Sequence, residues 1–139
     1  MTSSIEHVMP IRVRYSETDA MGFLHHANYF NYFEMGRTEL FRQQGGNYRR
    51  MEELGLFLVV SKLNCRYRRP ARYDDELMLQ TLLISSGPVK LIHEYKLFRG
   101  KELLAEADST LACVNRDGEV CRIPANLEEL TAEERGVEE

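Results

Sequence analysis

The feature that most constrains this fold is one long apolar segment with helical periodicity, from about Ala27 to Gln44. Large apolar side chains recur every three or four residues along it, which is typical of a buried helix face. They are Tyr29, Tyr32, Phe33, Gly36 and Leu40, with Phe30 and Phe41 widening the surface. The following Gly45-Gly46 pair is a typical helix terminator. So broad an apolar surface predicts a helix covered on most of its sides.

Strand-like segments make up most of the remaining sequence, separated by glycine and proline turn signals. The expected strands are Val8–Tyr15, Leu58–Arg69, Glu76–Ser85, Lys90–Phe98, Glu102–Val114 and Val120–Ile123, with short helices at Asn47–Leu54 and Ala125–Glu134. One long helix and a sheet of about five antiparallel strands can bury each other if the sheet curls around the helix. The sequence therefore predicts an α+β domain, and its open sheet edges favour a homo-oligomer.

Composition restricts the functional classes. The 139 residues fit a single domain spanning 1–139, with an ordered core at about 8–130 and a polar tail from near Thr131. The net charge of −4 gives no support to nucleic-acid binding, and no apolar run approaches the roughly 20 residues that span a bilayer. The N-terminus does not resemble a secretory signal. The three cysteines lack CxxC spacing, so we expect reduced thiols and a cytoplasmic protein.

The residues between the first strand and the long helix are the candidate site. Asp19 and Gly22 lie in this turn, and His25 and His26 lead into the helix. A lone aspartate here is often only a turn residue. However, the N–H groups of a helix start favour negative charge, and could polarise a substrate carbonyl beside an ionised carboxylate. The spacing therefore permits Asp19 to attack a carbonyl or to activate water.

We do not expect a metal site. His25 and His26 are adjacent, so they do not share a helix face, and no partner three or four residues away supplies a further ligand. His93 lies in an alternating apolar strand and is expected to be a packed core residue. The expected role of His26 is therefore to present its backbone N–H at the helix start, with its side chain lining a cleft.

Several charged residues allow more than one interpretation. Glu34 and Arg37 form an i,i+3 pair typical of a helix surface, although Glu34 lies among aromatic residues and could face a partner subunit. A basic cluster could contact ligand phosphates or form a solvated strand face. It consists of Lys62, Arg66, Arg68, Arg69 and Arg72. Lys90, beside the Gly87-Pro88 turn, is a second phosphate candidate.

With these residues in view, the chain resembles the 4-hydroxybenzoyl-CoA thioesterase family, and most closely its YbgC-type acyl-CoA thioesterases. The matching positions are Tyr15, Glu17-Thr18-Asp19, Gly22, His26, Tyr29, Glu34 and Arg37, followed by Pro70-Ala71 and Tyr73-Asp74-Asp75. The resemblance covers nearly the whole chain. One branch of the family carries a run of basic residues near the third-to-fourth strand turn, where this chain has the single Lys90, so no CoA-phosphate contacts are transferred from that branch.

The resemblance implies a hotdog fold, a homodimer or a tetramer built as a dimer of dimers, and hydrolysis of an acyl-CoA without metal or cofactor. Asp19 falls on the family's catalytic aspartate, as nucleophile or general base, and His26 falls where the helix amide polarises the thioester carbonyl. Tyr15, Gly22 and Tyr29 would shape the turn and pocket. The alternatives are a non-catalytic acyl-CoA or acyl-carrier binding module, or an assembly scaffold, and a hydratase or dehydratase of the same fold.

Overall fold

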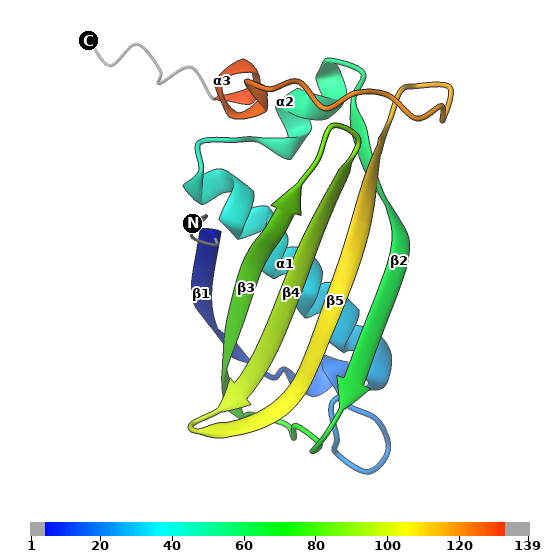
Figure 1. Cartoon of the computed structure of the whole chain (residues 1–139). Helices are drawn as coiled ribbons and strands as arrows, with labels where there is room; N and C mark the ends of the chain where they lie inside the picture. Colours follow the sequence, from blue (N-terminus) through cyan, green and yellow to red (C-terminus); the bar gives the residue numbers. More distant parts are fainter. Residues whose placement is uncertain (1–4, 133–139) are drawn as a thin grey trace, which may run out of the picture.

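The computed structural model describes residues 5–132 as one antiparallel sheet with a long helix lying across one face (Figure 1). The elements are β1 (Ile5–Arg12), the 3-10 turn η1 (Tyr15–Glu17), α1 (His26–Gln43), α2 (Tyr48–Glu53), β2 (Phe57–Tyr67), β3 (Glu76–Ser86), β4 (Lys90–Arg99), β5 (Glu102–Val114) and α3 (Leu127–Thr131). The strand order is β1-β3-β4-β5-β2. This confirms the predicted α+β class and agrees with the hotdog fold that the resemblance implies.

The core lies between α1 and the sheet. Phe33 of α1 stacks on Tyr95 of β4, with their ring centroids 4.7 Å apart. Gly36 allows the helix to approach the sheet closely, since a Cβ atom there would lie 2.2 Å from Thr81 Oγ1 and 2.8 Å from Leu79 Cδ2. The helix position is therefore set by the absence of a side chain at Gly36 as much as by the aromatic residues around it.

The ends of α1 follow the sequence prediction to within one residue. Its C-terminus closes with Gly45 at a φ of +92°, and the Gly46 N–H donates to the Phe41 carbonyl at 2.9 Å. This is the glycine-dependent closure that the Gly45-Gly46 pair predicted. The prediction of a helix covered on most sides is not met within one chain, because Asn31, Glu34 and Met35 are exposed.

Two predicted strands differ from the structure. The first strand ends at Arg12 rather than Tyr15, because the chain turns into η1. The segment Val120–Ile123 forms no strand and makes only a single bridge, between Val120 and Val114. β2 lies along one side of β5 to its end, and β4 covers the other side as far as Ala112, so this segment can pair only with the last residues of β5.

The last predicted helix is shorter than expected, beginning at Leu127 and ending at Thr131, and the rest of the predicted tail lies outside the described residues. Within residues 5–132, no helix combines the length and the apolar character needed to cross a membrane.

Candidate active site

Asp19 lies in a tight turn, residues 18–24, which we call the Asp19 turn. Thr18 pairs with Leu24 across its base. Oδ1 of Asp19 accepts hydrogen bonds from the N–H groups of Met21 at 2.9 Å and Phe23 at 3.1 Å, while Gly22 has a φ of +81°. Asp19 is exposed, and its second oxygen, Oδ2, has no hydrogen-bond partner among the described residues. Thus one oxygen of the carboxylate holds the turn and the other faces outward.

The Asp19 turn is joined to the start of α1 through the carbonyl of Glu17. This oxygen accepts hydrogen bonds from the His25 N–H at 2.9 Å and from Asn28 Nδ2 at 2.8 Å. The His25 side chain caps the helix, because its Nδ1 accepts from the Ala27 N–H at 3.1 Å. The N–H of His26, the first residue of α1, has no partner in the described part of the chain. The structure therefore leaves an unpaired helix-start donor at the residue that the sequence selected.

Glu17 stabilises the segment between β1 and α1 through its side chain, a role that the sequence analysis did not predict. Its buried carboxylate accepts from the Arg14 N–H at 2.8 Å, the Tyr32 hydroxyl at 2.7 Å and the Arg14 guanidinium at 3.1 Å. Burial acts to raise the pKa of Glu17, but the hydrogen bonds from Arg14 and Tyr32 outweigh it and lower that pKa below its ordinary value. The Tyr32 position fifteen residues away gave no local signal for this contact.

The loop before β3 forms a wall beside the Asp19 turn. The Leu24 N–H donates to the Ala71 carbonyl at 2.8 Å, and the Tyr73 N–H donates to the Gly22 carbonyl at 3.1 Å. The Arg72 guanidinium lies over the Phe23 ring, 4.7 Å from its centroid. This places Arg72, alone among the predicted basic cluster, directly against the turn that carries Asp19.

Four tyrosines lie around the site. Tyr15 is exposed and meets Tyr73 edge to face at 5.6 Å. Tyr29 is buried, and its hydroxyl accepts from the Ala71 N–H at 3.4 Å. Tyr67 at the end of β2, which the sequence did not single out, packs against Tyr29 at 4.8 Å and donates its hydroxyl to the His26 carbonyl at 3.1 Å. Tyr67 thus connects the sheet edge to the helix start.

Glu34 and Lys90, which the sequence analysis singled out as candidates for a partner or ligand contact, do not join Asp19 within one chain. Glu34 is exposed on α1 and lies 3.9 Å from Arg37. Lys90 is the first residue of β4, and Arg99 is the last. The Arg99 end lies near the Asp19 turn, because Arg99 pairs with Asp75 in the loop that borders this turn. A strand of this length spans about 30 Å. Lys90 could therefore meet Asp19 only if a second chain brought it there.

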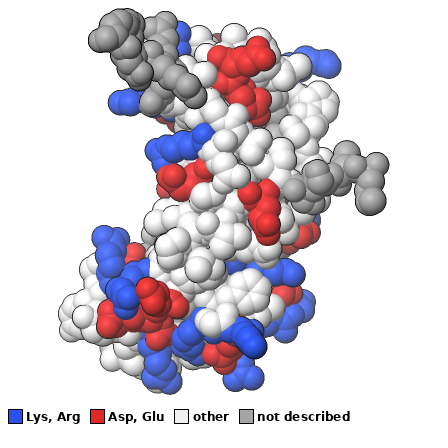
Figure 2. Space-filling view, turned by 90° about the vertical axis from the view of Figure 1, so that its left-hand side faces the viewer, with Lys and Arg blue, Asp and Glu red and all other residues white. Residues whose placement is uncertain are grey.

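Charge at this end of the molecule is mixed in sign. Figure 2 shows Lys and Arg interspersed with Asp and Glu at the lower end, which carries the Asp19 turn in Figure 1. Arg68 and Arg69 of the predicted basic cluster are paired with Glu106 and Glu102, at 3.0 and 3.2 Å. Within residues 5–132, no three histidine, cysteine or acidic side chains gather as a metal site.

Comparison with known proteins identifies relatives along most of the chain. The sequence model of the Thioesterase-like superfamily matches residues 13–131. The acyl-CoA thioesterase YbgC of Haemophilus influenzae is 36% identical over 107 residues, covering 76% of this chain and 79% of that protein.

Solved structures give the same result. A hypothetical protein from Aquifex aeolicus superposes with a TM-score of 0.83 at 32% identity, covering 90% of this chain and 98% of that one. The DHNA-CoA thioesterase of Staphylococcus aureus superposes with a TM-score of 0.81 at 28% identity, covering 84% of this chain and 80% of that one.

Proposed function

The chain belongs to the thioesterase-like superfamily, and on that premise we propose that it hydrolyses an acyl-CoA thioester to the free acid and CoA. One structural observation links this proposed activity to particular residues, Asp19 and His26. An exposed carboxylate oxygen, Oδ2 of Asp19, and an unpaired helix-start N–H, that of His26, are held by a single hydrogen-bonded unit. Thioester cleavage needs both a nucleophile or base and a donor for the developing oxyanion.

In the proposed reaction, the thioester carbonyl oxygen accepts a hydrogen bond from the His26 N–H, where the helix dipole also stabilises negative charge. Asp19 Oδ2 either attacks the carbonyl carbon or removes a proton from an attacking water. In the first case the C–S bond breaks, CoA leaves as a thiolate, and water then hydrolyses the acyl-aspartyl anhydride. In the second case the water oxygen adds to the carbonyl carbon, the C–S bond breaks, and the proton held by Asp19 passes to the departing thiolate. Tyr15, Gly22 and Tyr29 shape the turn and pocket, and no metal takes part.

The first test is Asp19→Asn, which keeps the side-chain oxygen that can accept from Met21 and Phe23 but removes the charge. Release of free thiol from a panel of acyl-CoA substrates should fall at least a hundredfold. Asp117→Asn, in an exposed turn elsewhere, is the matched control and should retain wild-type turnover. A wild-type protein that binds acyl-CoA without turnover, or an Asp19→Asn variant with full turnover, would contradict the proposal.

A second measurement separates the two roles of Asp19. After rapid mixing and acid quenching, a nucleophile leaves a chain whose mass is increased by the acyl group, and peptide mapping places that group on Asp19. A general base leaves no such adduct. Chelation of divalent metals should leave turnover unchanged, and a loss that added metal restores would contradict the metal-independent mechanism.

We extend the proposal to a cytoplasmic homo-oligomer, a dimer or a tetramer. The strand β2 is at an edge of the sheet and exposes Val59, Val60 and Tyr67. An open edge with apolar side chains is suited to pairing with another strand. The three cysteines lack CxxC spacing, in keeping with a reducing compartment. Sedimentation equilibrium should give the mass of a dimer or tetramer, and a monomer at micromolar concentration would contradict this assembly.

A further inference from the structure

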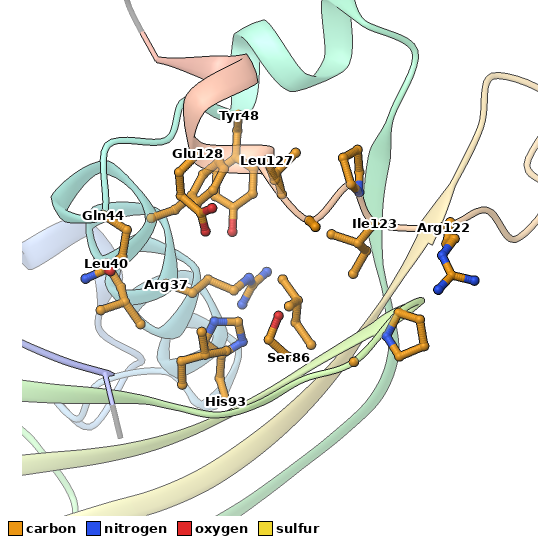
Figure 3. Close-up of a pocket in the computed structure, with 17 residues that line it drawn as sticks. Arg37, Leu40, Gln44, Tyr48, Ser86, His93, Arg122, Ile123, Leu127 and Glu128 are labelled. Carbon is orange, nitrogen blue, oxygen red and sulfur yellow. The ribbon is translucent and has the colours of Figure 1, made fainter. Parts of the chain in front are cut away.

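A cavity of about 400 Å³ lies where the C-terminal half of α1 meets the β3–β4 turn and the segment before α3. Ligand sites in proteins commonly have volumes of about 300–1,000 Å³. Figure 3 shows the guanidinium of Arg37 reaching into this space, with His93 and Ser86 beside it. Arg37 lies eleven positions after His26, so it is about 16 Å farther along the helix axis. This cavity is therefore separate from the Asp19 turn.

Arg37 carries a charge that the described chain compensates poorly. Its side chain is only 13% exposed. Its polar contacts are long: the Tyr95 hydroxyl lies 3.5 Å from Nη1, and the Glu34 carboxylate lies 3.9 Å from Nη2. Glu34 itself is largely in water, which screens the pair. A buried guanidinium is costly in free energy without close hydrogen-bond acceptors. An anion in the cavity would supply a charged acceptor at short distance.

His93 adds a second polar group that points to a ligand. It is 3% exposed and lines the cavity, and its Nδ1 is buried with no hydrogen-bond partner within residues 5–132, so the ring nitrogen left for a ligand is Nε2. Burial, helped by the charge of Arg37, lowers the pKa of His93 to about 4, so the ring is neutral at physiological pH. A neutral imidazole can donate one hydrogen bond to a ligand oxygen.

The remaining lining favours an apolar body with a single negative charge. The apolar wall consists of Leu40, Phe41, Leu83, Leu91, Ile123 and Leu127. Arg122 and Glu128 also line the cavity and carry opposite charges, so the formal charge of the lining is that of one cation. A dianion such as a phosphate monoester would leave one charge unmatched.

We propose that this cavity binds a monocarboxylate with an apolar chain. The carboxylate meets the Arg37 guanidinium and the His93 ring, and the chain lies against the apolar wall formed by α1, β3, β4 and the segment before α3. The proposal concerns a site at the other end of α1 from Asp19, and it does not depend on the proposed hydrolysis.

The test is calorimetric titration of the full-length protein with octanoate, and with octan-1-ol as the uncharged equivalent of the same chain length. Wild type should bind octanoate more tightly than octan-1-ol. Arg37→Gln should weaken octanoate binding roughly ten- to hundredfold and leave octan-1-ol unchanged. Arg42→Gln, an equal charge change on the exposed side of the same helix, is the matched control and should bind octanoate as wild type does.

Two further variants locate the binding and keep the test decisive if Arg37→Gln does not fold. Ser86→Phe, at an exposed cavity-lining position at the end of β3, should fill the space and abolish binding of both compounds. Asp19→Asn should bind octanoate normally. No octanoate binding by wild type, equal binding by Arg37→Gln, or binding lost in Asp19→Asn but retained in Ser86→Phe would overturn the proposal.

Discussion

Replacing Glu17 by glutamine should destabilise the protein by about 2 kcal/mol at neutral pH, although Glu17 touches no substrate in the proposed reaction. Oε1 of Glu17 accepts from the Arg14 N–H and from the buried Tyr32 hydroxyl, and Oε2 accepts from the Arg14 guanidinium. Glutamine can keep the first oxygen, but it places an NH₂ donor against the guanidinium donors.

The magnitude follows from these contacts. The Arg14 side chain is 74% exposed and can turn into water, so loss of that ion pair costs at most about 1 kcal/mol. The two bonds to Oε1 lose their charge assistance, which costs about 1 kcal/mol each, and relief of carboxylate burial offsets part of the sum. Urea unfolding at a fixed chain concentration, followed by circular dichroism, measures the difference.

Two comparisons make the prediction specific to these hydrogen bonds. In a double-mutant cycle, Glu17→Gln and Tyr32→Phe should couple by at least about 0.5 kcal/mol, because they share one bond. The folded-state pKa of Glu17 lies below its ordinary value of 4.5, so its contribution is complete at neutral pH and is lost as the pH falls through the folded pKa. A neutral-pH loss below 0.5 kcal/mol, or a difference between wild type and variant that grows in acid, would refute this reasoning.

Three further predictions concern the helix, the buried histidine and the helix start. Gly36→Ala should destabilise the fold by about 1–3 kcal/mol despite the better helix propensity of alanine, because its Cβ would overlap Thr81 Oγ1; an unchanged or higher melting temperature would contradict this. Burial and the nearby Arg37 lower the pKa of His93 to about 4. As the pH falls from 6.5 to 4, the free energy of unfolding of wild type should therefore decrease by about 3 kcal/mol more than that of His93→Gln. Parallel profiles of stability against pH for the two proteins would contradict this prediction. Asn28→Ala removes the 2.8 Å bond to the Glu17 carbonyl and should lower kcat roughly tenfold with little change in KM. The control is Asn126→Ala, at an exposed position before α3 whose side chain caps nothing, and it should keep the wild-type kcat. Equal kcat values for the two variants would show that the Asn28 bond does not position the site.

The sequence by itself determined the parts of this protein that depend on local spacing. Apolar periodicity fixed α1 to within one residue, and Gly45-Gly46 fixed its end, because helix geometry and a left-handed closure are properties of neighbouring residues. The resemblance selected Asp19 and His26, which lie seven residues apart around a turn closed by Asp19 itself.

Only the tertiary structure decided which distant groups meet. The segment Val120–Ile123 has the pattern of a strand, but it fails to form one because β4 already covers that side of β5 as far as Ala112. The buried role of Glu17 depends on α1, which brings the Tyr32 hydroxyl against its carboxylate. Similarly, the cavity at Arg37 and His93 exists because a helix and a strand fifty-six residues apart in the sequence meet in the folded chain. Side-chain contacts of this kind depend on how helices and strands pack, so they cannot be predicted from the spacing of residues along the chain.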